Sequence, residues 1–401
     1  MKIGILTFHR SYNYGAFMQC FSLVKKLQKD FPEQIIEVID FSSRKAMDGY
    51  TRDIERIQDE NLRKRIKARN VAFTKVQGDL PLSTWNKISD EYIDTIEFMN
   101  REYDAVIVGS DAVWNWTVRG IPNIYFLDAY KGCKFSYAAS AHGLNYQNMT
   151  EEQRAYVKNA FLDFKYIGVR DITTENMVKY ADDTLRVYHN CDPTAFLNLE
   201  DVPCDIDKLK EKMQKAGVDF SKPLIGVMAS NAIGRSIKKY WAGKAQIIAL
   251  YEPNKYADVF LNDLTPYEWA KVFSLFKVTV THFFHGTMLS LVNGTPVIPI
   301  EFTNAFSAVN KTKIHDVMDR LELSDWRFTA NYRNMSKVIR VFKKLGLWQD
   351  HQLWNAVNKL IADCMHNDYS DMIRQKLELE VQNYMSLQQA IDQMIKENNN
   401  G

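Results

Sequence analysis

Short apolar runs rich in β-branched residues alternate with longer stretches of mixed polarity along the first half of the chain. This alternation is typical of a parallel sheet covered by helices on both faces. A helix is predicted over residues 16–29, after the first strand and a polar loop. The predicted strands are Lys2–Phe8, Ile35–Phe41, Asp104–Gly109, Lys134–Ala139, Tyr166–Val169 and Arg186–Asn190. Together they predict one doubly wound, Rossmann-like domain over residues 1–200.

Residues 42–101 break this pattern because they are highly charged and contain few β-rich runs. We predict a helical insertion there. Within it, the basic stretch Asn61–Arg69 is most simply a solvated helix face. The alternative is a basic amphipathic helix that rests on an anionic membrane surface.

A second alternation begins after the polar, Lys/Asp-rich segment 199–222. Thr265, Pro266 and Glu268 form a good helix start, because Thr caps, Pro occupies the first helical position and Glu completes a capping box. The helix is predicted over Pro266–Phe276. The predicted strands are Leu224–Ala229, Ala245–Tyr251, Val259–Leu261, Lys277–Thr281 and Pro296–Glu301. We predict a second Rossmann-like domain over residues 221–345.

Two doubly wound domains in tandem have the plan of the glycosyltransferase-B architecture. Ligands of such sheets bind outside the carboxyl ends of the strands, so the two domains are expected to face a shared cleft. The last stretch, residues 346–401, is helical and amphipathic, and we expect it to pack back onto the domains. The predicted fold class is therefore α/β, glycosyltransferase-B-like, with additional C-terminal helices.

Charge and composition exclude several classes of function. The 51 basic residues nearly cancel the 49 acidic ones, so the chain lacks the overall field that nucleic-acid-binding proteins use. The first residues contain no h-region of a signal peptide, and no run is long enough to span a bilayer. We expect a cytoplasmic protein. The 5 cysteines are scattered, which argues against a zinc ribbon or a disulfide framework.

The stretch from Thr281 to Leu289 is the most informative for chemistry. A strand ends, His285 and Gly286 follow, and an apolar helix is predicted over Gly286–Asn293. The N–H groups of Gly286, Thr287 and Met288 would then point out of a helix start, which is a ready site for phosphate or carboxylate. The alternative is that His285 only caps the helix. A metal at His282 and His285 is rejected, because no third ligand follows at workable spacing.

Two further strand ends carry polar residues. In Gly109–Asn115, Asp111 and Asn115 could hydrogen-bond sugar hydroxyls and Trp114 could stack on a sugar ring, or the segment is an ordinary turn with a packed tryptophan. Arg170 is suited to a forked contact with phosphate or carboxylate, although it could equally pair with Asp171.

These motifs, taken together, resemble the polysaccharide pyruvyl transferase family over residues 1–323. The resemblance rests on the Gly15 loop, Gly-Ser-Asp-x-x-Trp-Asn, Arg170-Asp171, Asp192-Pro193-Thr194, Phe-His-Gly-Thr, Asn-Gly-Thr-Pro-Val-Ile and Lys313-Ile314. The first loop departs from the pattern, because it reads Asn-Tyr-Gly-Ala without the acidic residue that many members carry.

The resemblance implies transfer of a pyruvyl group from phosphoenolpyruvate to a sugar of a surface polysaccharide or its lipid-linked precursor. The product is a cyclic ketal, phosphate is released, and neither a metal nor another cofactor is expected. By motif position, His285 and Arg170 are expected to be catalytic residues. The donor site is expected to contain Gly286, Thr287, Met288, Lys313, Ser230 and Asn231. The acceptor site is expected to contain Asn13, Gly15, Asp111, Trp114 and Asn115.

Two other functions stay open at this point. A sugar-nucleotide-dependent glycosyltransferase would share the architecture, although the segment after Thr295 offers only Glu301 as a carboxylate to grip a ribose. A non-catalytic carbohydrate-binding member of the family is the other alternative. The joint presence of His285, Arg170 and Lys313 argues against it.

Overall fold

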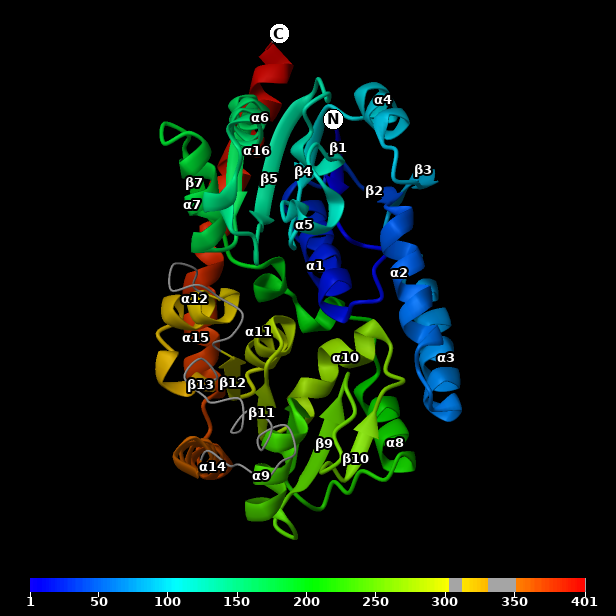
Figure 1. Ribbon diagram of the computed structural model, residues 1–401, viewed down its shortest axis with the longest axis vertical. Coiled ribbons are helices and arrows are strands. Elements are labelled where there is room, and N and C mark those ends of the chain that lie inside the picture. Colours follow the sequence, from blue (N-terminus) through cyan, green and yellow to red (C-terminus); the bar gives the residue numbers. More distant parts are fainter. Residues whose placement is uncertain (303–311, 331–350, 401) are drawn as a thin grey trace. The chain divides into compact units, whose positions relative to one another are not determined.

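The computed structural model describes residues 1–302, 312–330 and 351–400. The chain divides into two compact units, which are described separately (Figure 1). The first unit contains Met1–Phe196, Asn310–Lys313 and Val381–Gly401. The second unit contains Leu197–Val309 and Ile314–Glu380. The domain end expected near residue 345 lies outside the described residues.

The first unit is built on a parallel sheet of 7 strands in the order β3-β2-β1-β4-β5-β6-β7. Its strands are β1 (Lys2–Leu6), β2 (Ile35–Ser42), β3 (Leu82–Ile88), β4 (Ala105–Val108), β5 (Cys133–Ala139), β6 (Phe164–Val169) and β7 (Val187–His189). Every neighbouring pair is parallel. All four residues of β4 are buried, as expected for a central strand covered on both faces.

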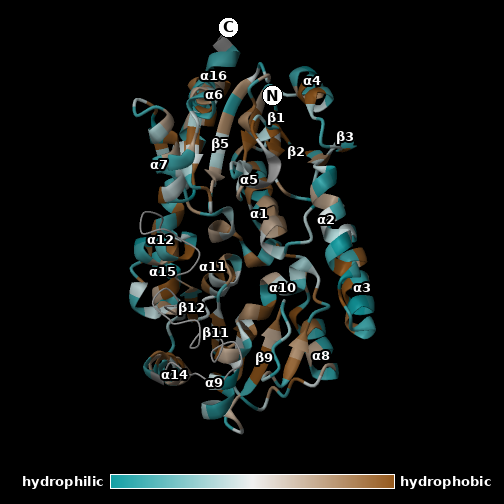
Figure 2. Cartoon of the chain, viewed as in Figure 1, coloured by the Kyte–Doolittle hydropathy of each residue, from teal (hydrophilic) through white to brown (hydrophobic). Residues whose placement is uncertain are grey.

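The charged segment 42–101 contains a strand that the sequence analysis missed. It begins with two helices, as predicted, but β3 follows and extends the sheet at its edge, and the helix α4 comes after it. Figure 2 shows hydrophilic residues along much of α2 and α3. The helices of this unit are α1 (Tyr14–Asp30), α2 (Arg44–Glu55), α3 (Glu60–Gln77), α4 (Ile93–Glu102), α5 (Trp116–Arg119), α6 (Glu151–Leu162), α7 (Ile172–Ala181) and α16 (Met385–Asn400).

The second unit is built on a parallel sheet of 6 strands in the order β10-β9-β8-β11-β12-β13. Its strands are β8 (Leu224–Met228), β9 (Gln246–Leu250), β10 (Val259–Leu261), β11 (Val278–Thr281), β12 (Val297–Phe302) and β13 (Phe328–Ala330). The edge strand β13 was not predicted. The other strands lie where the apolar runs predicted them, and both units confirm the doubly wound α/β class.

Local capping signals fix several helix starts in the second unit. The Thr265 capping box and Pro266 start α10 as predicted, but that helix ends at Val272 and a 3₁₀ turn follows. The helices are α8 (Ile206–Lys215), α9 (Asn231–Trp241), α10 (Pro266–Val272), α11 (Phe284–Val292), α12 (Lys313–Arg320), α14 (His351–His366) and α15 (Ser370–Val381). Among the described residues, no helix has the length and apolar character needed to cross a bilayer.

The C-terminal helices pack onto the sheets as expected, but they divide between the units. In the second unit, α14 places Trp354, Val357 and Ile361 in the core that contains β8 and β11. In the first unit, the segment around α16 contacts β6, where the hydroxyls of Tyr166 and Ser386 lie 2.6 Å apart. The helical tail therefore contributes to two separate cores.

A buried ionic network ties the ends of β1 and β2 together in the first unit. His9 Nε2 lies 2.8 Å from Asp40 Oδ1, and Arg10 donates from Nε and Nη2 to the two Asp40 oxygens. Gln77 at the end of α3 donates to the His9 carbonyl at 2.9 Å. Burial opposes the charged form of Asp40, but the contacts with His9 and Arg10 outweigh it and lower the Asp40 pKa. The network therefore anchors the helical insertion to the sheet.

Replacement of Asp40 by asparagine should destabilise the first unit. Breaking a buried ion pair leaves its partner charge uncompensated, so Asp40→Asn should lower the free energy of unfolding by on the order of 3 kcal/mol at pH 7. Because the Asp40 pKa is lowered in the folded state, its contribution is present above the unfolded pKa and lost as pH falls through the folded one. The difference between wild type and variant should therefore shrink on acidification. Urea unfolding across this range tests both points.

The matched control is Asp94→Asn, because the Asp94 side chain is 64% exposed and pairs only with a surface lysine in the described contacts. Its effect should stay below about 1 kcal/mol. Equal effects of the two substitutions would contradict the anchoring role of Asp40.

Candidate functional site

Each sheet reverses its strand order once, and open α/β sheets bind ligands outside the carboxyl ends of the strands at such a reversal. In the first unit the reversal lies between β1 and β4, and in the second unit between β8 and β11. Nearly all residues predicted to be functional follow a strand of one sheet or the other.

The turn after β4 has a backbone that only certain residues can adopt. Gly109 has φ of +113°, and a Cβ there would lie 2.3 Å from the Tyr137 carbonyl oxygen, so the position requires glycine. Asp111 has φ of 83°, which is rare for a residue other than glycine, and such conformations concentrate at functional sites. The turn thus presents Asp111 in a fixed conformation at the edge of the sheet.

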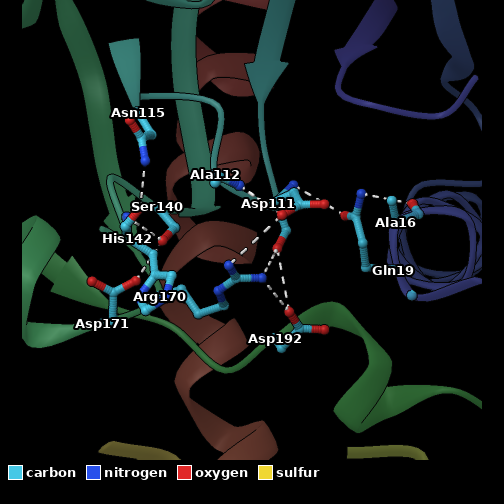
Figure 3. Close-up of polar contacts among 12 residues, drawn as sticks. Ala16, Gln19, Asp111, Ala112, Asn115, Ser140, His142, Arg170, Asp171 and Asp192 are labelled. Atoms are coloured by element: carbon cyan, nitrogen blue, oxygen red, sulfur yellow. Dashed lines mark hydrogen bonds and ion pairs between the residues drawn. The ribbon is translucent and has the colours of Figure 1, made fainter. Parts of the chain in front are cut away.

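Gln19 on α1 locks this turn to the end of β1 (Figure 3). Its Nε2 donates to Thr7 Oγ1 and to the Ala16 carbonyl, both at 2.9 Å, and its Oε1 accepts from the Ser110 N–H. Gln19 could not be identified from the sequence, because a glutamine inside an apolar helix carries no distinctive motif. It is nevertheless the residue that joins α1 to both sides of the strand reversal.

Arg170 lies at the centre of a buried cluster, which we call the Arg170 cluster and which includes Ser110, Asp111, Asp171 and Asp192 (Figure 3). Its Nη1 donates to Asp192 Oδ2 at 2.8 Å, and its Nη2 lies 3.9 Å from Asp111 Oδ1. The Arg170 side chain is only 1% exposed. Its guanidinium therefore pairs with carboxylates of the protein, and its expected contact with the donor stays a prediction.

The adjoining carboxylate, Asp171, is held by the ends of β5 and α7. It accepts from Ser140 Oγ at 2.6 Å and caps α7 through the Thr174 N–H and hydroxyl. Burial disfavours its charge, but Arg170 and these hydroxyls more than compensate, so the Asp171 pKa is lowered. Asp171 is thus a structural anion, and Ser140 was not identified from the sequence.

Two basic groups beside the cluster have strongly lowered pKa values. Burial, helped by the charge of Arg170, lowers the pKa of Lys313 to about 8. Burial and the charge of Lys313 lower the pKa of His142 to about 4, so the imidazole is neutral at pH 7. Ionisable groups with shifted pKa values that cluster at a strand edge are typical of functional sites. His142 follows β5 directly, and this position was the only sequence signal for it.

Three residues expected to bind the acceptor have local structural roles. Asn13 caps α1 by accepting from the N–H groups of Gly15 and Ala16. Gly15 is buried in the first turn of that helix. Asn115 caps α5 and donates to the His142 carbonyl at 2.6 Å. The side-chain bonds of Asn13 and Asn115 position the edge of the sheet. Asp111, at 15% exposure, stays the most accessible carboxylate of the Arg170 cluster.

Trp114 does not lie where a sugar could stack on it. Its side chain is fully buried, and its indole packs against Phe161 with ring centroids 4.7 Å apart. Its Nε1 donates to the Tyr125 carbonyl at 3.0 Å. This burial contradicts the prediction that Trp114 stacks on a sugar ring. Its side chain instead holds the backbone at Tyr125 in place.

In the second unit, the helix after β11 begins two residues earlier than predicted. Helix α11 starts at Phe284, and the Thr287 N–H already bonds to the Phe283 carbonyl. The N–H groups that precede this bond belong to Phe284, His285 and Gly286. Thr287 and Met288 are fully buried in the core, so the predicted N–H donors shift toward the strand.

Gly286 is required for packing at this point. A Cβ on Gly286 would lie 2.4 Å from Met228 Cε and 2.8 Å from Thr281 Oγ1. Helix α11 thereby approaches the ends of β8 and β11 closely. This packing explains the glycine without a ligand, and the expected place of Gly286 in the donor site stays a prediction.

His285 and His282 both lie at this edge. His285 is 8% exposed and its ring meets Phe284 edge-on, with centroids 5.2 Å apart. His282 Nε2 lies 3.9 Å from Glu252 Oε2, and burial lowers the His282 pKa while it raises the Glu252 pKa. Burial thus shifts both groups toward their neutral forms, and within the described residues no three metal-binding side chains gather here or elsewhere.

A second helix start lies at the neighbouring strand end. Ser230 is the N-cap residue of α9 and follows β8, and Asn231 accepts from the Lys255 N–H at 2.8 Å. Because β8 and β11 are adjacent in the sheet, the starts of α9 and α11 belong to the same edge. Both helices direct the positive ends of their dipoles there. We call this edge, with Ser230, His282 and His285, the His285 edge.

The fold and these edges define an α/β protein built from two Rossmann-like units. A sequence model of the family described as "Polysaccharide pyruvyl transferase" matches residues 13–304, which is most of the chain. The chain belongs to this family. The match includes His285 and Arg170, but it ends before Lys313.

Solved structures share the fold at low sequence identity. The UDP-GlcNAc 2-epimerase of Methanocaldococcus jannaschii is 11% identical with a TM-score of 0.50, covering 92% of this chain and all of its own. A Listeria monocytogenes protein described as a candidate UDP-N-acetylglucosamine 2-epimerase is 10% identical with a TM-score of 0.52, covering 99% of this chain and 97% of its own. A search of curated sequences found no significant match.

Substitution of Arg170 separates a structural role from donor binding. Arg170→Ala leaves the buried Asp192 carboxylate without its main cation, so the free energy of unfolding of the first unit should fall by about 3–5 kcal/mol. Denaturant unfolding measures this loss, and Arg170→Lys should recover part of it. The control Lys158→Ala removes a half-exposed partner of Asp182 and should cost less than about 1 kcal/mol. An Arg170→Ala protein of wild-type stability that has lost only its response to phosphoenolpyruvate would show direct donor contact instead.

Proposed function

We propose that this chain transfers the pyruvyl group of phosphoenolpyruvate to two hydroxyls of one sugar in a surface polysaccharide or its lipid-linked precursor. The product is a cyclic pyruvate ketal, and inorganic phosphate is released. The observation that carries the proposal is the family match over residues 13–304. The geometry of the His285 edge supports it, because two adjoining helix starts suit an anionic donor.

The charges of the two edges favour the second unit for the donor. In the Arg170 cluster, the carboxylates of Asp111, Asp171 and Asp192 face the cations Arg170 and Lys313, so a donor with phosphate and carboxylate groups would meet an already compensated site. At the His285 edge, N–H groups and histidines dominate. We therefore propose that the donor's anionic groups bind at the starts of α9 and α11, near Ser230 and Asn231.

The proposed reaction balances without a redox partner. The methylene carbon of phosphoenolpyruvate takes a proton while one sugar hydroxyl attacks the adjacent carbon. Phosphate then leaves, and the second hydroxyl closes the ring. The two hydroxyls release two protons, of which one balances the methylene proton and the other accompanies phosphate. His285 is the proposed acid, since an imidazole can exchange protons near neutral pH.

On the acceptor side, we propose that Asp111 accepts hydrogen bonds from sugar hydroxyls. It is held in a rare backbone conformation and is more exposed than the other carboxylates of the Arg170 cluster. The proposed setting is the cytoplasmic side of the membrane, where a lipid-linked acceptor would be presented. The basic residues of α3, including the exposed Lys64, are a proposed contact with that surface.

Removal of the His285 imidazole should abolish most turnover without unfolding the protein. If His285 is the general acid, His285→Ala should lower kcat by on the order of 10²–10⁴-fold. Phosphate release from phosphoenolpyruvate measures the loss, and thermal unfolding checks the fold. The control is His366→Ala, because His366 lies exposed at the end of α14. A near-normal kcat in His285→Ala would leave His285 as a packing residue of α11.

Donor identity and metal dependence are tested together. The proposed donor site uses N–H groups and basic side chains, so turnover with phosphoenolpyruvate should survive excess EDTA. Purified protein is incubated with phosphoenolpyruvate and a panel of lipid-linked or nitrophenyl sugars, and phosphate release and product mass are followed. Sugar nucleotides should not be consumed. Loss of turnover on chelation, or use of a sugar nucleotide in place of phosphoenolpyruvate, would favour a glycosyltransferase instead.

A further inference from the structure

The first unit contains a pocket that none of the motifs predicted. It has a volume of about 580 Å³ and lies between α2, the loop after β3 and the segment 122–125. We call it the α2 pocket. Pockets that bind small molecules typically range from about 300 to 1,000 Å³, so this one can hold a sugar ring with its neighbour. All of its lining residues belong to the first unit.

Residues 122–125 form one side of the α2 pocket, which we call its floor, and neighbouring side chains hold their backbone in place. Trp114 donates to the Tyr125 carbonyl, and Asn123 accepts from the Tyr125 N–H at 3.1 Å while it donates to the Gly120 carbonyl. The Tyr125 ring meets Phe8, which follows β1, with centroids 5.2 Å apart. The floor is therefore rigid and continuous with the strand reversal between β1 and β4.

The wall formed by α2 is tied to the opposite side of the pocket. Ser43 Oγ donates to Asp90 Oδ1 at 2.6 Å, and the Lys45 N–H donates to the same oxygen at 3.1 Å. These bonds lower the Asp90 pKa, so Asp90 is charged at neutral pH and keeps its hold on the helix start. Midway along this wall, a Cβ built on Gly49 meets no atom within 4 Å. The wall is therefore recessed at Gly49.

The lining chemistry favours a polyhydroxylated ring over other ligands. Three tyrosines line the pocket, and tyrosine combines an apolar ring with a hydroxyl that can donate and accept. The charged lining residues are balanced, with Lys45 and Arg52 opposed by Asp53 and Asp90. That balance does not suit a phosphate donor, and the number of polar groups does not suit a lipid chain.

We propose that the α2 pocket binds a hexose ring of the acceptor glycan. The proposal rests on the proposed transferase function for the identity of the glycan, but sugar binding itself is testable without the donor. It places acceptor recognition largely on the insertion at residues 42–101, in the same unit as the edge that carries Asp111. Trp114 then serves the acceptor indirectly, by holding the floor of this pocket.

The test is direct binding of a panel of p-nitrophenyl hexosides to the full chain in the absence of phosphoenolpyruvate, followed by ligand-observed NMR. The variant Gly49→Trp fills the recess from the wall, and glycine replacement favours the helix. At least one hexoside should bind wild type, and Gly49→Trp should weaken it by about tenfold or more. The matched control Asp48→Trp adds the same side chain at the neighbouring exposed position, which does not line the pocket. It should leave binding unchanged.

A second variant keeps the test decisive if Gly49→Trp unfolds. Tyr50→Ala removes a lining ring instead of filling the space, and it should weaken the same hexoside severalfold at wild-type thermal stability. The proposal is overturned if no hexoside binds wild type, or if neither folded variant weakens binding. Failure of the transferase function has a different signature, because hexosides would still bind while phosphoenolpyruvate is not consumed with any acceptor.

Discussion

The buried guanidinium of Arg170 is the constraint on which the first unit's edge depends. It holds Asp192 from the end of β7 and approaches Asp111 from the turn after β4, so three strand ends are fixed by one side chain. A charge at 1% exposure is tolerable only when such partners surround it. The same pairing uses up its charge. Arg170 therefore sets the geometry of the edge and the electrostatic setting of Lys313 and His142, whose pKa values it lowers.

The Arg170 cluster and the His285 edge differ in how they could hold an anionic donor. A compensated cluster of carboxylates and cations offers little net attraction for a phosphate. Adjoining helix starts offer partial positive charge without a counter-ion, which is the more general way in which α/β proteins bind phosphate. The strand order of the second sheet produces this arrangement, rather than any single residue. The order reverses between β8 and β11, so the helices that follow these two adjacent strands begin at the same edge.

The inner strands could be predicted from sequence, since a strand buried on both faces reads as a continuous apolar run, as Ala105–Val108 does. The edge strand β3 could not, because only one of its seven residues is buried and its charged and polar positions resemble the helices around it. The start of α11 was misplaced because its N-cap position is Phe283, whose side chain makes no capping bond, so no cap residue marked the boundary. The ion pair of Arg170 with Asp192 joins residues from separate strands, and only the sheet brings them together.

Trp114 shows that a motif can identify the family correctly while the contact predicted for one of its residues is wrong. Its position in Gly-Ser-Asp-x-x-Trp-Asn indicated a sugar-binding aromatic residue, yet burial and its bond to the Tyr125 carbonyl make it part of the scaffold. A residue that fixes backbone geometry is restricted more tightly than one that only lines a pocket, because its volume, its hydrogen bond and its packing must all be kept. The lining of the α2 pocket comes largely from the insertion at residues 42–101, where the side chains of α2 can change without disturbing the sheet. In this arrangement the motif maintains the strand edge of the first unit, and side chains of the insertion can vary without altering that edge, which is what the proposed acceptor binding requires.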